Sequence, residues 1–185
     1  MDKPDPSSVQ SVRIARIAPA DLSAYKSLRD EGLRLHIDAF DNDIESEHAR
    51  PPESYIGRLG LSDTLGGTFL LGAWDGRQLV GTIGLERQSL QKLRHSAELN
   101  SMMVSPSHMG SGLGDQLMTA CISEARKAIG LEQITLRVST SSTAAIRLYE
   151  RAGFQACGVV PHVIKLVDGP GQVRYFDKLT MVMIL

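Results

Sequence analysis

The feature that most constrains this 185-residue chain is the segment 104–130, which reads VSPSHMGSGLGDQLMTACISEARKAIG. Its three glycines, Gly110, Gly112 and Gly114, alternate directly before an amphipathic pattern that predicts a helix from Gly112 to Ala128. The first amides of a helix have no internal partner and lie at the positive end of its dipole. Because glycine has no Cβ, a phosphate can approach such amides closely. The segment predicts a pyrophosphate site, and a tight turn without a ligand is the alternative.

Two familiar phosphate-binding motifs do not fit this segment. A P-loop requires Lys followed by Ser or Thr after its last glycine, whereas Asp115 and Gln116 follow Gly114 here. A dinucleotide-binding loop requires its third glycine three residues after the second, and Gly114 comes too early. Glu132 also precedes the next predicted strand, so it is not at the strand end where a ribose would bind. A nucleotide-binding oxidoreductase is therefore disfavoured.

The patterns along the rest of the chain predict one mixed α/β domain over residues 11–185, preceded by a polar, flexible leader over residues 1–10. We expect a bent, mostly antiparallel sheet of about seven strands and about four helices. The predicted strands are 12–17, 68–74, 78–87, 98–104, 133–138, 155–167 and 173–185. The predicted helices are 22–40, 51–60, 112–128 and 143–152, with a polar loop over 41–50.

Composition excludes several classes of protein. The formal net charge of −1 gives no general attraction to nucleic acid or to anionic membranes. No apolar run approaches the length of about 18 residues that a membrane-spanning helix needs. We expect Cys121 and Cys157 to be reduced core residues, so neither is expected in a disulfide, a metal site or a nucleophilic role. No metal site is predicted, and a cytoplasmic location is expected.

Two blocks of sequence resemble the GNAT superfamily of acyl-CoA-dependent N-acyltransferases. The first block is carried by Val104, Pro106, Met109, Gly112 and Gly114. The second block is carried by Ser142, Ala145, Leu148, Tyr149, Glu150, Gly153 and Phe154. The blocks occur in the order and at the separation typical of the family, and the resemblance covers about residues 11–185.

The resemblance implies a sheet whose fourth and fifth strands splay apart, with acetyl-CoA bound in the gap as co-substrate. The backbone of Met102, Met103 and Val104 would bond the pantetheine arm like an added strand, helped by a bulge near Met102 and Met103. The pyrophosphate would be held by the glycine loop, which we define as residues 109–115. Its expected binding residues are Met109, Gly110, Ser111, Gly112, Leu113, Gly114 and Asp115.

Two positions depart from the family pattern. Met109 stands where the family prefers Arg or Gln, and His108 beside it could replace part of the lost phosphate contact. Ser142 stands where Asn is usual, and either Ser142 or Thr143 could cap the following helix. Both departures would weaken coenzyme binding without removing the backbone amides. Ser142 is retained as a predicted binding residue.

The resemblance also implies direct attack of an amine on the thioester in a ternary complex. Tyr149 matches the general acid that protonates the departing thiolate. Glu98 on the fourth strand is the first candidate for the general base, Glu86 on the preceding strand is the second, and His95 in a turn is a third. Arg137 occupies the position where some family members carry a fifth-strand glutamate, which excludes that variant.

The acceptor is left open by the sequence, beyond a primary amine of a small molecule or peptide. An acidic run could attract a cationic amine, or it could be a solvated loop. This acidic run comprises Asp38, Asp41, Asp43, Glu45 and Glu47. Arg174 could instead bind the carboxylate of an amino acid. A homodimer through the last strand, TMVMIL, is expected, and a non-catalytic acyl-CoA sensor or scaffold is the alternative function.

Overall fold

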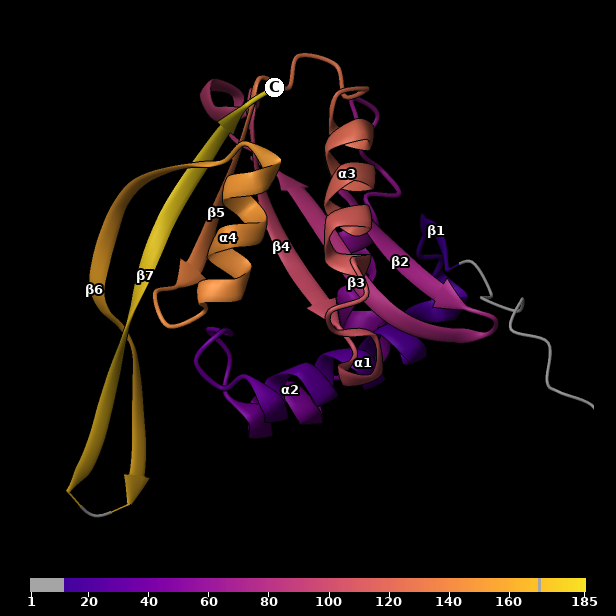
Figure 1. Ribbon diagram of the computed structural model, residues 1–185. Helices are drawn as coiled ribbons and strands as arrows, with labels where there is room; N and C mark the ends of the chain where they lie inside the picture. Colours follow the sequence, from indigo (N-terminus) through magenta and orange to yellow (C-terminus); the bar gives the residue numbers. More distant parts are fainter. Residues whose placement is uncertain (1–11, 170) are drawn as a thin grey trace, which may run out of the picture.

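The computed structural model describes residues 12–169 and 171–185, so the predicted leader over residues 1–10 lies outside the described part. Seven strands form one sheet in the order β1-β2-β3-β4-β5-β7-β6 (Figure 1). The strands are β1 (Arg13–Arg16), β2 (Phe69–Asp75), β3 (Gln78–Arg87), β4 (Ser96–Val104), β5 (Gln133–Ser139), β6 (Gln155–Gly169) and β7 (Gln172–Ile184). The predicted mixed α/β fold with a mostly antiparallel sheet is confirmed.

Four α-helices accompany the sheet within the described residues, together with short 3₁₀ segments. The α-helices are α1 (Leu22–Leu35), α2 (Ile44–Ala49), α3 (Leu113–Ala125) and α4 (Thr143–Ala152). The 3₁₀ segments are η1 (Pro19–Asp21), η2 (Pro52–Leu59), η3 (Gln91–Leu93) and η4 (Pro106–His108). None of the helices in the described part is long and apolar enough to cross a membrane.

Two buried clusters lie on the two faces of the sheet. Leu117 and Cys121 of α3 pack with Leu71 of β2 in one cluster. Tyr25 of α1 packs with Leu70 of β2 in the other cluster. Since successive strand residues point to opposite faces, α3 and α1 cover opposite sides of the sheet (Figure 1). Each fully buried leucine contributes about 1.5–3 kcal/mol of transfer free energy to this packing.

The fourth and fifth strands separate almost as soon as they pair. Their parallel ladder joins Ser96–Glu98 only to 133–135, after which β4 and β5 continue without pairing to each other. The β5 side of residues 99–104 therefore has no neighbouring strand. This confirms the predicted splay and leaves an open strand edge inside the molecule.

A bulge interrupts β4 on its other side. The register with β3 shifts between Thr82, which faces Met103, and Gly84, which faces Asn100. Two β4 residues consequently oppose Ile83, and one of them, Ser101, has a left-handed φ of 53°. The predicted bulge near Met102 and Met103 is present, displaced by one residue.

The helix that begins at Leu22 is shorter than predicted. It ends at Leu35, and His36 leaves the helical conformation with φ −136° and ψ 65°. The reason is tertiary, because Asp38 bonds to Ser139 at the end of β5 and to Ser141 just after it, which draws the chain toward β5. Similarly, α3 ends at Ala125 and not at Ala128.

The predicted polar loop over 41–50 is wrong in part, because it contains α2. Asp43 caps this helix by accepting a hydrogen bond of 2.8 Å from the amide of Ser46. Glu47 points inward and is fully buried. The sequence did not indicate α2, because this acidic helix is held by a buried ionic contact and has no apolar periodicity.

Two further expectations are corrected by burial and pairing. Cys121 is buried as predicted, but Cys157 on β6 is exposed and is not a core residue. The last strand is central, because β7 pairs with β5 on one side and with β6 on the other. A homodimer stays a prediction. In TMVMIL, pairing with β6 reaches Val182, so only Met183 and Ile184 lack a paired residue on that side of the strand.

Candidate active site

A cavity of about 1230 Å³ lies where β4 and β5 separate. Its walls come from the splayed part of β4, the glycine loop, the start of α4, and the connection from α1 to α2. Of the predicted site residues, it is lined by Glu98, Met102, Met103, Val104, Met109, Gly110, Gly112, Leu113, Gly114, Asp115, Ser142 and Tyr149. The structure thus brings most of the predicted residues to one cavity, although their roles remain predictions.

The glycine loop presents unpaired backbone donors at this cavity. Gly110 and Gly112 have φ values of +75° and +82°, and a Cβ at either would meet no atom within 4 Å. Within the described residues, no carbonyl or side chain accepts from the amides of residue 110 or of residues 112–115. Five donors next to open space at the start of α3 fit a diphosphate, so the loop meets the requirement of coenzyme A.

Other members of the loop lie differently. The amide and the hydroxyl of Ser111 both donate to the carbonyl of His108, at 3.4 Å and 2.6 Å, and Ser111 is outside the cavity lining. Asp115 accepts from Arg151 of α4 at 2.9 Å. That ion pair offsets a carboxylate that would otherwise repel a phosphate.

The two departures from the family pattern, Met109 and Ser142, are not compensated by neighbouring side chains. Met109 is 51% exposed and gives the loop an apolar side chain in place of a polar one. His108 is held by Asp75 at 3.3 Å and by the hydroxyl of Ser107 at 2.9 Å, so both ring nitrogens are engaged within the protein. Ser142 makes no side-chain capping bond to α4. The expected compensation by His108 and the expected serine cap are therefore not seen.

Tyr149 lies in the C-terminal half of α4 and lines the cavity. Its side chain is 7% exposed and packs edge-on against Phe154, with ring centroids 6.0 Å apart. Burial raises the pKa of Tyr149 to about 12. The phenol therefore remains protonated at neutral pH, as a proton donor must.

The two glutamate candidates occupy different surroundings. Glu98 lines the cavity, and its Oε1 lies 3.4 Å from the guanidinium of Arg137 on β5. Glu86 is its cross-strand partner on β3, but it is exposed and outside the cavity lining. His95 remains in a turn before β4, where its carbonyl accepts from Glu132. The geometry favours Glu98 over the other two.

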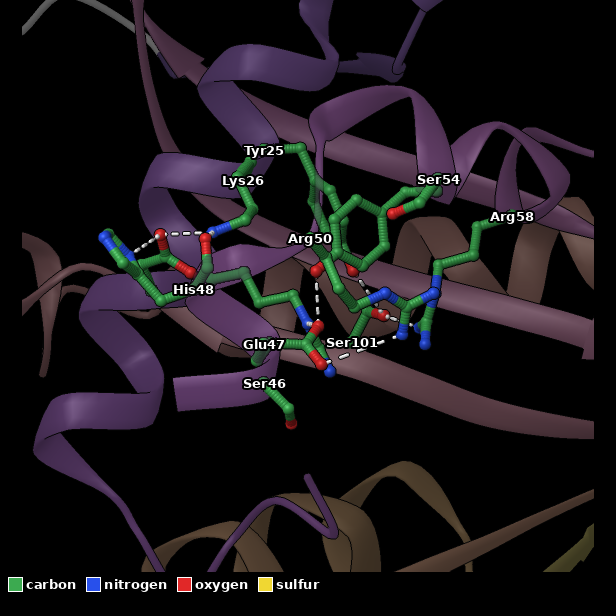
Figure 2. Close-up of polar contacts among 12 residues, drawn as sticks. Tyr25, Lys26, Ser46, Glu47, His48, Arg50, Ser54, Arg58 and Ser101 are labelled. Carbon is green, nitrogen blue, oxygen red and sulfur yellow. Dashed lines mark hydrogen bonds and ion pairs between the residues drawn. The ribbon is translucent and has the colours of Figure 1, made fainter. Parts of the chain in front are cut away.

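The acidic run is largely neutralised by partners. Asp41 contacts Arg137 and Lys178, each at 3.4 Å. Glu47 receives a 2.5 Å hydrogen bond from Arg29 and another from Tyr55 (Figure 2). Asp43 caps α2 and Asp38 bonds to Ser139 and Ser141, so Glu45 is the member of this run whose exposed carboxylate has no partner among the described residues. The run therefore supplies little net field for a cationic amine.

Sequence reasoning missed the polar group at the β4 bulge. Arg58 of η2 donates from Nη1 to the hydroxyl of Ser101 at 2.6 Å (Figure 2). The same Nη1 donates to the side-chain oxygen of Asn100 at 3.3 Å. The hydroxyl of Ser101 also lies 3.0 Å from that of Tyr25 on α1. No motif marks these residues, because they meet only when η2 and α1 pack on β4.

Comparison of the chain with known protein families identifies the family to which it belongs. The model of the acetyltransferase (GNAT) family matches residues 29–154, which is more than half of the chain. The chain belongs to the GNAT acetyltransferase family. This confirms the predicted family and an acyltransferase as the enzyme class, and it makes acetyl-CoA the co-substrate.

Several GNAT relatives align over much of the chain. The N-acetyltransferase YsnE of Bacillus subtilis is 36% identical over 110 residues, or 58% of this chain and 69% of YsnE. The mycothiol acetyltransferase of Salinispora tropica is 28% identical over 152 residues, or 82% of this chain. That alignment covers only 47% of the mycothiol enzyme, so this chain spans about half of its length.

Solved GNAT structures share the fold. The protein yncA of Salmonella typhimurium, solved with acetyl-CoA, superposes with a TM-score of 0.78 at 23% identity over 94% of each chain. The ribosomal-protein-alanine N-acetyltransferase of Brucella melitensis superposes with a TM-score of 0.73 at 24% identity, over 94% of this chain and 99% of its own. At these identities the likeness establishes the fold alone.

Proposed function

We propose that this protein transfers an acetyl group from acetyl-CoA to a primary amine of a small molecule or peptide, by direct attack in a ternary complex. The observation that carries the proposal is the set of five unpaired amides in the glycine loop, whose residues line the same cavity as Tyr149. Named relatives act on such acceptors, including a mycothiol acetyltransferase and the N-alpha-acetyltransferase RimI of Mycobacterium tuberculosis.

The coenzyme would be held by its diphosphate at the glycine loop and by its pantetheine arm along residues 102–104 of β4. That stretch has an unpaired edge facing β5, so an extended arm can add to it as a strand would. Ser142 at the start of α4 would flank the arm. The acetyl end would then lie near the bulge, between Tyr149 and Glu98.

The chemistry requires a neutral amine, a donor to the oxyanion and a proton for the thiolate. Glu98, acting through water, takes the proton from the incoming ammonium, and Arg137 beside it holds that carboxylate in place. An amide on the β5-facing edge of β4 donates to the oxyanion of the tetrahedral intermediate. The amide of Met103 is turned the other way, because Met103 is paired with Thr82 of β3 and Ser105 donates to Val80 two residues along. As the carbon–sulfur bond breaks, Tyr149 gives its phenolic proton to the departing thiolate. Glu86 is retained only as the second candidate for the base.

Thiol release from acetyl-CoA, measured with a panel of primary amines, tests the function. We expect Tyr149→Phe to lower kcat by about 100-fold or more, the usual contribution of a general acid, with little change in the KM for acetyl-CoA. Tyr175→Phe is the matched control, because Tyr175 stacks on His162 of the β6–β7 hairpin, outside the cavity. Full activity of Tyr149→Phe would remove Tyr149 from the mechanism.

The candidate bases are separated by the same assay. Glu98→Gln should lower kcat more than Glu86→Gln, since only Glu98 lines the cavity. The reverse order would assign the base to Glu86. Acetyl-CoA binding without thiol release for any amine would instead indicate a coenzyme sensor. A cytoplasmic location and a homodimer stay predictions.

A further inference from the structure

Most cationic side chains that line the cavity already have a carboxylate partner. Arg29 pairs with Glu47 at 2.5 Å, Arg151 with Asp115 at 2.9 Å, and both Arg137 and Lys178 with Asp41 at 3.4 Å. Among the described residues, the two arginines of the lining with no carboxylate within 4 Å are Arg58 and Arg147. Arg147 belongs to α4, whose next residue, Leu148, lies against Gly114 of the glycine loop. Arg147 is exposed on α4, whereas Arg58 is half-buried, so Arg58 is the one of the two that loses water in the fold.

Arg58 lies beside the β4 bulge. Its Nη1 donates to two neutral oxygens, those of Ser101 (Figure 2) and of Asn100. The side chain is half-buried between η2 and β4. A guanidinium that loses part of its water without gaining an anion is destabilising, unless the anion comes from a ligand.

The remaining donors of Arg58 are suited to such a ligand. A guanidinium has five N–H donors in a planar fork, and only those on Nη1 have a partner among the described residues. Neither Nε nor Nη2 is among the fully buried, unsatisfied atoms, so both are accessible. Two adjacent free N–H groups match the two oxygens of a carboxylate.

The neighbouring strand positions support this assignment. The Nδ2 of Asn100 has only a long 3.5 Å contact with Glu86, which leaves it able to donate to the same anion. Glu98 lies two residues along β4, about 7 Å away along the strand. An amine at Glu98 and a carboxylate at Arg58 would thus be a few bonds apart in one small molecule.

We propose that the acceptor is a small amino acid whose free carboxylate is bound by Arg58, with Asn100 as a second donor. The proposal rests on the acetyltransferase function and names its substrate class. A polyamine or other purely cationic acceptor is disfavoured, because the acidic run that could attract one is paired within the fold.

Matched acceptors test the proposal on the unaltered protein. Thiol release is measured with an amino acid, its carboxamide and its decarboxylated amine, for several side chains, and each rate is expressed per neutral amine. A charge-assisted pair predicts that kcat/KM for the acid exceeds that for the amide by roughly 10- to 100-fold. Equal values, or a preference for the decarboxylated amine, would overturn the proposal.

Variants of Arg58 locate the preference. In Arg58→Gln the acid-to-amide ratio should fall close to one, mainly through a higher KM for the acid, and Arg58→Lys should restore part of it. Arg77→Gln, in the exposed β2–β3 turn, is the matched control and should keep the wild-type ratio. A wild-type ratio in Arg58→Gln would remove Arg58 from acceptor binding. If Arg58→Gln does not fold, Arg58→Lys and the matched acceptors still decide.

Failure of this proposal is distinguishable from failure of the function. Thiol release that needs an amine but ignores the carboxylate would overturn the substrate class alone. No thiol release with any acceptor, despite acetyl-CoA binding, would overturn the acetyltransferase function and this proposal together.

Discussion

Burial acts on two titratable side chains in the same direction but with different consequences. It raises the pKa of Tyr149 to about 12, and it raises that of Cys121 to about 12 with help from the negative charge of Glu124. Tyr149 lines the cavity, so its retained proton is available to a ligand. Cys121 is on the buried face of α3 and is 0% exposed, so its thiol is not reached by water. Burial and protonation therefore both argue against a covalent intermediate on Cys121, and Cys157 is not among the residues that line the cavity.

Thiol labelling measures this difference. At pH 8 the native protein should react with an alkylating reagent at one site, Cys157, which is exposed on β6, and at two sites after unfolding. Cys157→Ser should leave the native protein unreactive, with acetyl transfer unaffected. Rapid labelling of native Cys157→Ser would show that Cys121 is reached by solvent.

At the scale of the element, the turn into α3 couples backbone conformation to ligand binding. Gly112 precedes the first residue of α3 with a left-handed φ, which keeps the first amides of the helix directed at the cavity without a Cβ in front of them. Glycine adopts this φ without strain, and its lack of a Cβ leaves the amides uncovered.

Comparing Gly112→Ala with Gly171→Ala separates two effects of the added Cβ. One is backbone strain at a positive φ, and the other is obstruction of the diphosphate site. Gly171 in the β6–β7 turn has φ +80°, close to the +82° of Gly112, and a Cβ at either meets nothing within 4 Å. Both variants should lose about 1–2 kcal/mol of stability from the left-handed alanine. Only Gly112→Ala should raise the KM for acetyl-CoA, by about 10-fold, as amide–phosphate contacts are lost. Equal KM values for the two variants would contradict the assigned diphosphate site.

Elements with a strong local pattern could be predicted from the sequence, and elements made by tertiary contacts could not. The strand 78–87 and the helix 143–152 have the predicted bounds, and the glycine loop lies at the cavity. By contrast, α2 is held by the pairing of Glu47 with Arg29, and Arg58 reaches the site through the packing of η2. No motif or spacing in the sequence indicates that residues 58 and 101 are in contact.

Across the whole molecule, one buried ionic cluster joins three elements on the α1 side of the sheet. Glu47 of α2 accepts from Arg29 of α1 and from Tyr55 of η2, and Arg50 lies 3.8 Å from its second oxygen (Figure 2). Burial alone would raise the pKa of Glu47, but the hydrogen bonds from Arg29 and Tyr55 outweigh it and leave the pKa lowered. The carboxylate is thus ionised inside the fold.

Removal of this carboxylate should destabilise the protein strongly. Glu47→Ala leaves Arg29 buried without an anion, which predicts a loss of about 3–5 kcal/mol in the free energy of unfolding. Glu45→Ala, on the exposed face of the same helix, should change it by less than about 0.5 kcal/mol. Chemical denaturation of both variants gives the comparison, and similar midpoints would show that the cluster contributes nothing.

The same cluster predicts the direction of acid unfolding. Because the folded-state pKa of Glu47 lies below its ordinary value of 4.5, its contribution to stability is fully present above that pH. It is lost as the pH falls through the folded-state pKa. Denaturation curves between pH 6 and 3 should therefore show a smaller acid-induced loss for Glu47→Gln than for the wild type, and parallel losses would contradict the assignment.

Because β4 and β5 share backbone bonds over so few residues, the width of the gap between them is set elsewhere. Side chains fasten the α1–α2 connection to the far wall, through Asp38 to Ser141 and through Asp41 to Arg137 and Lys178. Of these contacts, the Asp41–Arg137 pair is exposed on both sides and is weakened as salt screens it, whereas the Lys178 side chain is 3% exposed. The width of the gap therefore depends partly on ionic strength, while the backbone pairing of the sheet does not.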